Sequence, residues 1–343
     1  MKFLTTRWYV AAWPEQVTRT LLPRTILGEP VLLFRREDGT PVAIFDRCPH
    51  RFAPLSLGRL DGDVVECGYH GLRFNSAGKC VLNPHGNRAI PTVARVRAYP
   101  LVERHGLLWI WMGPPELATQ TPIPDLAFMA GAGSGLRTVH NYIHAHYSSD
   151  ILIDNLMDLS HAEFLHRGSF SSGYAAESTM KIQEDGDAVV VDRTLFRVEI
   201  PPFMVPMFDA GNRPVDHWYV YTWQPPGIIT YEFGVTAIGA ARDQGARLYA
   251  THIATPESET TTHYFASISR GYDLENQALD EFWRDVQYQP VATQDSPMLE
   301  AVQKRMGAAD FWTLKPVLLP IDAAPVKVRQ IMERLVERES TSA

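Results

Sequence analysis

Two short stretches of this sequence decide its fold: Cys48-Pro49-His50-Arg51 and Cys67-Gly68-Tyr69-His70-Gly71. Each stretch brings one cysteine and one histidine, and sixteen residues separate His50 from Cys67. Thiolates bind iron–sulfur clusters or zinc, and imidazoles bind zinc, copper or iron. Two loops that each offer both kinds of ligand therefore predict a metal site.

The spacing of these four ligands favours a Rieske [2Fe-2S] cluster over zinc. In a Rieske centre, two histidines replace two cysteines on one of the two irons. Structural zinc sites more often combine a Cys-x₂₋₄-Cys pair with a His-x₃₋₅-His pair, and zinc stays the alternative. Three cysteines do not form a disulfide framework, so we expect the remaining one, Cys80, to pack in the interior.

Length and composition limit the classes of protein that the chain can belong to. Its 343 residues leave room for one large domain or two ordinary ones. The net charge of -7 argues against nucleic acid as the main partner. We find no signal peptide and no apolar run long enough to span a membrane, so we expect a cytoplasmic protein without a membrane partner. No Gly-x-Gly-x-x-Gly fingerprint follows a strand, so a redox centre here must receive electrons from another protein.

The pattern along the chain predicts an α+β fold in two domains. We expect an N-terminal antiparallel β domain over residues 1–120 and a catalytic domain over 121–343, with a central antiparallel sheet flanked by helices. The proline-rich segment 113–125 marks the boundary. The predicted strands are 7–11, 31–36, 41–45, 64–66, 72–74, 107–111, 188–198, 217–223, 228–238, 247–254 and 262–269. The predicted helices are 150–166, 275–306 with interruptions near Pro290 and Pro297, and 325–337.

A second group of metal ligands lies in the predicted helix 150–166. His161 and His166 are five residues apart, about 140° around an ideal helix, so they share one metal only if the helix ends or bulges between them. Two histidines and one carboxylate hold Fe(II) in non-haem oxygenases and leave positions open for O₂. Asp295 is the candidate carboxylate, and a helix N-cap is its alternative role. Asp158 precedes His161 by three residues, so we expect its carboxylate to accept the imidazole N–H.

Together with Asp154-Asn155-Leu-Met-Asp158-Leu-Ser-His161, these motifs resemble a known family along nearly the whole chain. The chain is similar to the oxygenase (alpha) component of Rieske non-haem iron aromatic-ring oxygenases. Within that family it resembles the branch of vanillate and dicamba O-demethylases and toluenesulfonate methyl-monooxygenase. Arg7-Trp-Tyr-Val-Ala-Ala, Asn83-Pro-His-Gly-Asn and Thr255-Pro-Glu-Ser-Glu also resemble that branch. One departure is Ser148-Ser149-Asp150, which stands where relatives have an Asn-aromatic-Lys stretch.

The resemblance implies a role for each candidate residue. Cys48 and Cys67 bind one cluster iron and His50 and His70 the other, while His161, His166 and Asp295 hold a mononuclear Fe(II). Asp158 and Asn155 belong to the catalytic machinery. In a head-to-tail homotrimer, Asp158 bridges a cluster histidine of one subunit and His161 of the next. His252 matches a substrate-contacting position, and its alternative is a strand histidine that faces solvent.

The implied reaction is O₂-dependent O-demethylation of a small methoxylated aromatic acid. Hydroxylation of the methoxy carbon gives a hemiacetal that breaks down to a phenol and formaldehyde. NAD(P)H supplies electrons only through a separate ferredoxin or flavin reductase. The alternatives are a cis-dihydroxylating ring dioxygenase, a non-catalytic Rieske electron-transfer protein and a zinc-binding structural protein. Arg197 and Arg213 are the candidate partners of a substrate carboxylate.

Overall fold

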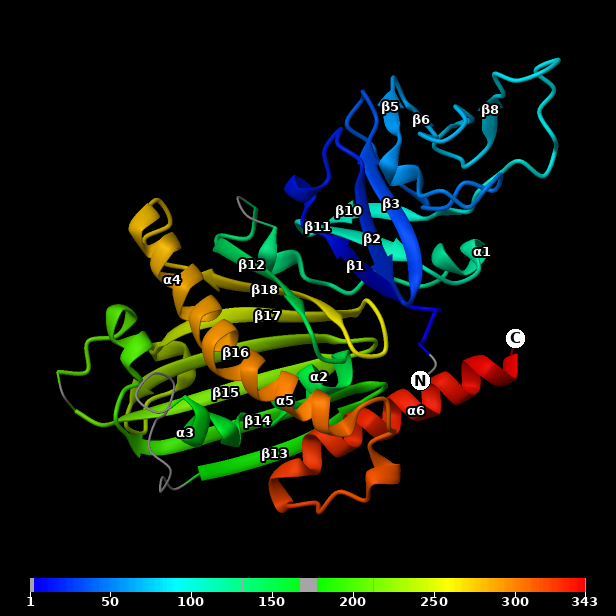
Figure 1. Ribbon diagram of the computed structural model, residues 1–343. Helices are drawn as coiled ribbons and strands as arrows, with labels where there is room; N and C mark the ends of the chain where they lie inside the picture. The colour runs from blue at the N-terminus through cyan, green and yellow to red at the C-terminus, as the bar shows by residue number, and fades with distance from the viewer. Residues whose placement is uncertain (1–2, 131–132, 167–177, 212, 343) are drawn as a thin grey trace. The chain divides into compact units, whose positions relative to one another are not determined.

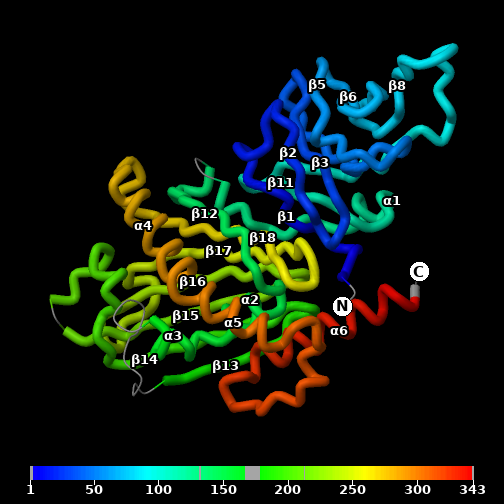
Figure 2. Tube along the Cα trace, viewed as in Figure 1, coloured from blue at the N-terminus to red at the C-terminus, as the bar shows by residue number. Residues whose placement is uncertain are grey.

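The computed structural model describes residues 3–130, 133–166, 178–211 and 213–342, and it divides into two compact units (Figure 1). The N-terminal unit is Thr5–Leu126, and the C-terminal unit combines Met1–Leu4 with Ala127–Ala343. Leu4 is buried in the core of the C-terminal unit, and the N-terminal unit follows from Thr5 onward. Figure 2 follows the same chain as a Cα trace. The first unit is built on strands and the second on a large sheet with helices, which confirms the predicted α+β class.

The N-terminal unit consists of three small antiparallel sheets. Their strand orders are β1-β11-β10, β2-β3-β4-β9 and β5-β6-β7-β8. The strands are β1 Trp8–Ala12, β2 Leu22–Ile26, β3 Glu29–Arg35, β4 Pro41–Phe45, β5 Arg59–Asp61, β6 Val64–Glu66, β7 Arg73–Phe74, β8 Cys80–Leu82, β9 Ala98–Tyr99, β10 Leu101–Arg104 and β11 Leu107–Trp111; a short helix, α1 Pro115–Ala118, follows them. The apolar strands β1 and β11 pair with each other and are buried along their whole length. The six strands predicted here correspond to β1, β3, β4, β6, β7 and β11.

The C-terminal unit is organised around a seven-stranded antiparallel sheet in the order β12-β18-β17-β16-β15-β14-β13. Its strands are β12 Arg137–Ala145, β13 Ser178–Asp185, β14 Ala188–Val198, β15 Val215–Gln224, β16 Ile228–Ala237, β17 Ala246–Pro256 and β18 Thr262–Arg270. The five strands predicted in this region correspond to β14–β18. The two outer strands were not predicted. The mostly exposed β13 lacks an apolar alternation, and histidines interrupt the apolar pattern of β12.

Helices cover one face of this sheet (Figure 1), and the one predicted over 150–166 ends earlier than expected. They are α2 Ser149–Met157, α3 Ala162–Leu165, α4 Gln277–Pro290, α5 Ser296–Met306 and α6 Ala323–Ser342. The predicted continuous helix 150–166 is wrong, because α2 ends at Met157. The predicted interruption near Pro290 and Pro297 is confirmed: α4 ends at Pro290, a π-helical turn, Val291–Asp295, follows, and α5 begins at Ser296 (Figure 1). Pro297 lies in the first turn of α5, where a missing N–H is tolerated.

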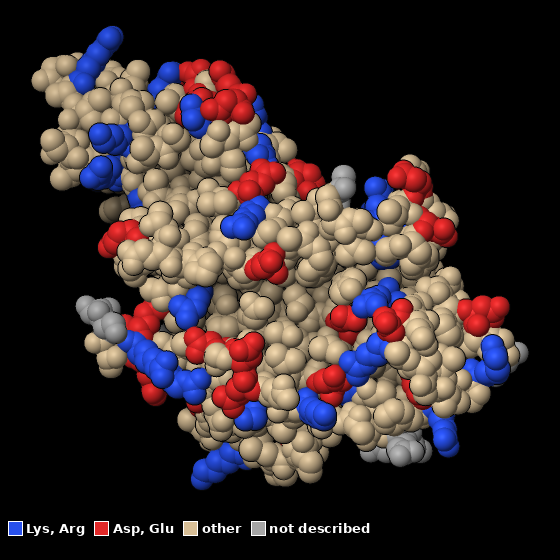
Figure 3. Space-filling view, turned by 180° about the vertical axis from the view of Figure 1, so that it is seen from behind, with Lys and Arg blue, Asp and Glu red and all other residues tan. Residues whose placement is uncertain are grey.

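The surface carries charges of both signs. On the face seen in Figure 3, acidic and basic side chains lie interspersed, without a broad basic area that would suit a polyanion. Across the described residues, no helix combines the length and apolar character that crossing a bilayer requires.

Candidate active site

The end of α2 positions the two histidines. The Ser148 hydroxyl caps the start of this helix by accepting a hydrogen bond from Ile151 N (3.3 Å). At the other end, Asp158 leaves the helical conformation, and its carboxylate accepts hydrogen bonds from Ser160 N (2.9 Å) and Ser160 Oγ (3.0 Å). A short 3₁₀ turn and α3 follow. The helix therefore ends between the two candidate ligands, and the rings of His161 and His166 lie 5.2 Å apart.

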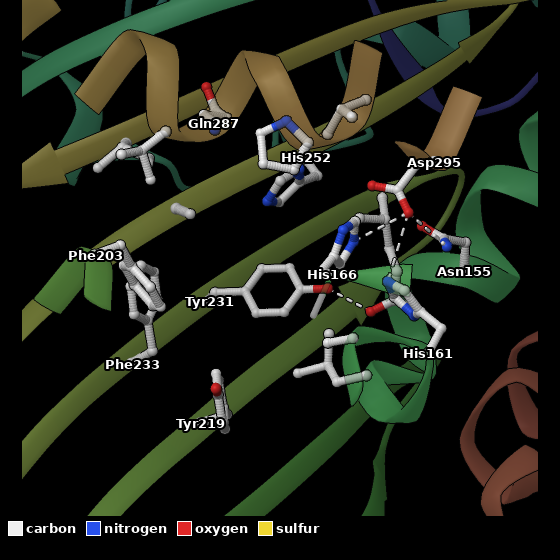
Figure 4. A pocket seen from close by; sticks show the side chains of 18 of the residues that line it. Asn155, His161, His166, Phe203, Tyr219, Tyr231, Phe233, His252, Gln287 and Asp295 are labelled. Atoms are coloured by element: carbon white, nitrogen blue, oxygen red, sulfur yellow. Dashed lines mark hydrogen bonds and ion pairs between the residues drawn. The ribbon is translucent and has the colours of Figure 1, made fainter. Parts of the chain in front are cut away.

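The π-helical turn delivers the carboxylate. Asp295 is the last residue of Val291–Asp295 and is buried. Its Oδ1 lies 3.2 Å from His166 Nε2 and 3.6 Å from His161 Nε2 (Figure 4). Although it stands just before α5, its side chain makes no capping hydrogen bond. The N-cap alternative is therefore wrong.

These three side chains fit one mononuclear metal ion. Their ligand atoms all lie within 4.8 Å of one another. Ligands about 2.1 Å from a common first-row metal ion lie roughly 3 Å apart, so a small closure completes the site. Two imidazoles and one carboxylate form the ligand set of non-haem Fe(II) oxygenases. Among the described residues, no other three His, Cys, Asp or Glu side chains converge this closely.

Hydrogen bonds fix which nitrogen of each imidazole faces the metal site. His161 Nδ1 lies 2.5 Å from the backbone carbonyl of Asp158, and His166 Nδ1 lies 2.6 Å from Gln294 Oε1. A carbonyl oxygen only accepts, so each Nδ1 carries the proton and each Nε2 is left as a bare ligand. The expectation that the Asp158 carboxylate accepts the His161 N–H is wrong, because the backbone carbonyl does so. No motif in the sequence pointed to Gln294 as a partner of His166.

Two further features of the site are the hydrogen bond from Asn155 to Asp295 and the raised pKa of His166. Asn155 Nδ2 donates a hydrogen bond to Asp295 Oδ1 (3.2 Å) and so orients the carboxylate. Burial lowers the pKa of His166, but hydrogen bonds to Asp295 and Gln294 outweigh burial and raise it above its usual value. This direction reflects the close, favourable contact between the imidazole and the carboxylate.

A mainly apolar cavity of about 170 Å³ lies beside the three ligands. His252 lines it and contacts the Tyr264 hydroxyl through Nδ1 (2.5 Å), so the solvent-facing alternative is wrong. Burial lowers the pKa of His252 to about 4, which keeps this side chain neutral near pH 7. Arg197 and Arg213, the predicted candidates for binding a substrate carboxylate, are both exposed, and neither lines the cavity. Arg193, for which no motif predicted a role, lines the cavity.

In the N-terminal unit, the two ligand loops share one hydrogen-bond pattern. Cys48 N donates to Ala53 O (2.8 Å) and Phe52 N donates to Cys48 O (2.9 Å). In the second loop, Cys67 N donates to Leu72 O (2.8 Å) and Gly71 N donates to Cys67 O (2.9 Å). Phe52 (φ 61°) and Gly71 (φ 70°) both adopt the left-handed conformation, which costs a glycine little and a phenylalanine more. The same tight loop is therefore built twice.

These loops bring the four predicted cluster ligands together. Cys48 and Cys67 are each 2% exposed, whereas His50 is exposed and its ring lies 4.5 Å from that of the half-buried His70. Burial raises the pKa of Cys48 to about 11, and the adjacent Cys67 adds to the rise. Thiolates here therefore need a bound cation, as in an iron–sulfur cluster. Cys80 packs in the interior, with its thiol 3.3 Å from Leu82 O.

Comparisons with known proteins cover both units. The vanillate O-demethylase oxygenase C-terminal domain matches residues 143–338, and the Rieske [2Fe-2S] domain matches residues 7–100. The oxygenase component of chloroacetanilide N-alkylformylase from Rhizorhabdus wittichii is 38% identical over 98% of this chain and 97% of that protein. The oxygenase component of dicamba O-demethylase from Stenotrophomonas maltophilia is 37% identical over 99% of this chain and 100% of that protein. The crystal structure of dicamba monooxygenase bound to 3,6-dichlorosalicylic acid superposes with a TM-score of 0.93, at 35% identity over 99% of each chain.

The relatives share both halves of the chain and are oxygenase components. They do not favour the ring dioxygenase, electron-carrier or zinc-protein alternatives. An enzyme of this kind uses O₂ and electrons that a separate reductase supplies, together with a Rieske cluster and a non-haem iron. The chain therefore belongs to the Rieske non-haem iron oxygenases, as an oxygenase component of the vanillate O-demethylase branch.

Proposed function

We propose that this oxygenase removes the methyl group of a small methoxylated aromatic acid. The observation that carries the proposal is the apolar cavity that opens directly beside His161, His166 and Asp295. Relatives named as dicamba and vanillate O-demethylases support the reaction type. The aryl methyl ether, O₂, two electrons and two protons give a phenol, formaldehyde and water. The electrons come from NAD(P)H through a ferredoxin or flavin reductase, which places the enzyme in the cytoplasm.

Each metal group has its own ligand set in this proposal. In the domain of residues 1–120, Cys48 and Cys67 hold one cluster iron and His50 and His70 the other, as the donor chemistry suggests. In the domain of residues 121–343, His161, His166 and Asp295 hold the mononuclear iron. When bound, the iron activates O₂ for insertion into a C–H bond.

The contribution of the chain itself is orientation and exclusion of water. Asn155 fixes the Asp295 carboxylate, while Gln294 and the Asp158 carbonyl fix the two imidazoles. The cavity wall holds the methoxy carbon beside the ligands and keeps bulk water away from it. Neutral His252 is placed to donate or accept one hydrogen bond to the substrate without adding a charge.

Electron transfer between the two metal sites involves a second subunit in this proposal. Near Asp158, a cavity is walled in part by Val317 and Leu318, which are 87% and 47% exposed. Beside the cluster loops, Phe52, Leu57, Tyr69 and Val93 are 65–79% exposed. Exposed apolar surface of this kind marks contacts between proteins. A head-to-tail homotrimer covers both areas and brings His70 of one subunit to Asp158 and His161 of the next.

A second candidate reaction is the oxidative removal of an N-alkyl group from a neutral anilide. It is favoured by the 38% identity to the N-alkylformylase oxygenase component. The two reactions share the hydroxylation of a carbon next to a heteroatom, and they differ in whether the substrate is an anion.

The first experiment measures iron, acid-labile sulfide and turnover on anaerobically purified protein. We expect roughly three irons and two sulfides per chain, and formaldehyde from a methoxybenzoate when a reductase and NADH are supplied. Zinc without sulfide contradicts the metal assignment. A full set of metals, with no formaldehyde from any methoxybenzoate, contradicts the proposed substrate class.

A further inference from the structure

One arginine, Arg193 on β14, is among the described residues that line the cavity beside the metal ligands. Arg193 is paired with Tyr219 on β15, and Tyr219 is paired with Phe233 on β16. These three side chains form one row across the face of the sheet and all line the cavity. Tyr231, two residues before Phe233 on the same face, contacts the carbonyl of Leu156 in the helix that precedes His161 (Figure 4). The row thus leads from Arg193 toward the metal ligands.

Arg193 has no partner within the part of the chain that the structure describes: no hydrogen bond or ion pair involves its guanidinium. Two other arginines of this unit, Arg242 and Arg270, are paired with carboxylates. Arg242 binds Asp192 (2.6 Å), the neighbour of Arg193 on the opposite face of β14, and Arg270 binds Asp280 (2.6 Å). A guanidinium drawn into a mainly apolar cavity loses hydration, and an acidic ligand compensates for that loss.

The other charged groups of the cavity leave Arg193 available. Two acids line the wall, Glu163 and Asp295, and neither forms an ion pair with Arg193. Asp295 is held by Asn155 and by the two histidines. Among the described residues that line the cavity, Arg193 is therefore the one arginine or lysine available to an incoming anion, at the β14 end.

We propose that Arg193 binds the carboxylate of the substrate and thereby selects aromatic acids over neutral aromatics. This proposal rests on the proposed function and deepens it. The planar guanidinium matches a carboxylate through two parallel hydrogen bonds. Neighbouring strands lie about 4.8 Å apart, so β16 lies roughly 10 Å from β14 across the sheet. An aromatic ring over Tyr219 and Phe233 then spans this interval, with its methoxy group directed toward the metal ligands.

Two other residues fit this role less well. Arg197 lies four positions after Arg193, but the register of β14 shifts between Leu195 and Val198 and Arg197 has a φ of 55°. That bulge turns Arg197 away from the cavity. His252 lines the cavity on β17, three strands from Arg193, and its lowered pKa leaves it without charge near pH 7. It supplies a hydrogen bond, whereas Arg193 supplies the charge.

The test compares an acid with its neutral isostere in binding and in turnover. The probes are 2-, 3- and 4-methoxybenzoate and the three matching methoxybenzamides, titrated into the iron-loaded protein by calorimetry. We expect the best benzoate to bind more tightly than its amide, and Arg193→Met to weaken that benzoate by about 10- to 100-fold with little effect on the amide. Arg193→Lys keeps the positive charge but loses the planar pair of N–H donors. It should therefore bind the benzoate more tightly than Arg193→Met does and less tightly than the wild type does. Arg213→Met, which changes an exposed arginine outside the cavity, is the matched control and should resemble the wild type.

Several results overturn the proposal. The first is that the wild-type protein binds no benzoate more tightly than the matching amide. The second is that Arg193→Met binds benzoate as tightly as the wild type does. The third is that Arg193→Met weakens the binding of benzoate and of amide equally. Formaldehyde release separates this inference from the proposed function. Formaldehyde from the amides alone supports demethylation and overturns the Arg193 proposal. Arg193-dependent benzoate binding without formaldehyde supports the anion site and contradicts the proposed reaction.

Discussion

Replacing Gln294 by leucine should weaken the mononuclear iron site without removing a ligand. Gln294 Oε1 accepts the proton of His166 Nδ1 at 2.6 Å, and His166 is 4% exposed. The variant leaves this N–H buried without its acceptor and frees the ring to turn. An unsatisfied buried donor costs about 1–3 kcal/mol, which corresponds to a loss of iron affinity of roughly 5- to 150-fold. Loss of such an outer partner typically lowers metal affinity 10- to 100-fold.

The assay is equilibrium dialysis of the cluster-containing protein against Fe(II) under anaerobic conditions, with iron and sulfide measured separately. Gln294→Glu presents an acceptor at the same place and should retain the affinity that leucine loses. Gln289→Leu changes an exposed glutamine on α4 and serves as the control. If Gln294→Leu stays folded and binds Fe(II) as tightly as the wild type, the hydrogen bond does not support the iron site.

Three further predictions concern other parts of the molecule. Asp158→Ala should leave iron and sulfide content unchanged and abolish turnover, because the proposed bridge between subunits is lost; metal analysis and oxygen uptake measure this. Arg329→Met should lower the free energy of unfolding in urea by about 2 kcal/mol, because Arg329 joins α6 to Asp154 of α2 in a pair whose carboxylate is 28% exposed. Burial lowers the pKa of His217 to about 3, so between that value and about 6.5 the unfolded chain binds a proton that the folded chain does not. The stabilising contribution is therefore complete above this window and is lost as the pH falls through it. From about pH 7.5 to about pH 5.5, the free energy of unfolding of the wild type should fall by about 1.4 kcal/mol more than that of His217→Gln.

Each of these predictions has a contradicting result. Asp158→Asn keeps most of the contacts to Ser160, so loss of iron in Asp158→Ala but not in Asp158→Asn indicates a local structural role instead of a bridge. The double variant Arg329→Met with Asp154→Asn should recover part of the lost stability, and no recovery contradicts the pairing argument. Parallel pH profiles for wild type and His217→Gln contradict a buried neutral histidine.

The strand and helix pattern of the sequence predicted the α+β class, the spacing of the four loop ligands predicted the cluster, and the family resemblance added the second metal group. Four ligands in two short loops leave few alternatives, because the backbone between Cys48 and His50 is too short to vary much. The second loop carries Gly71 where the left-handed conformation is needed. The first loop adopts the same conformation at Phe52, which no propensity predicts; tertiary contacts impose it.

Other parts of the site depended on details that side-chain types do not encode. Asp295 meets the histidines only because a π-helical turn precedes it, and its sequence reads equally well as a helix N-cap. Arg193 faces the cavity and Arg197 does not because of a bulge in β14, which the alternation of a strand cannot reveal. Nothing in the sequence around Gln294 marks it as a hydrogen-bond partner of His166. Its role follows from its position on the π-helical turn beside Asp295.

The π-helical turn also makes this enzyme sensitive to the length of its sequence as well as to its composition. A π-turn is an α-helix with one extra residue accommodated in a wider loop. If residues 291–295 formed a regular α-helix instead, the extra residue would turn every following side chain by about 100° and move it by about 1.5 Å along the axis. The carboxylate would then leave the histidines although all three ligands remain encoded. Homologues that gain a further residue here without a wider turn should differ in metal binding, even where an alignment shows the same His, His and Asp.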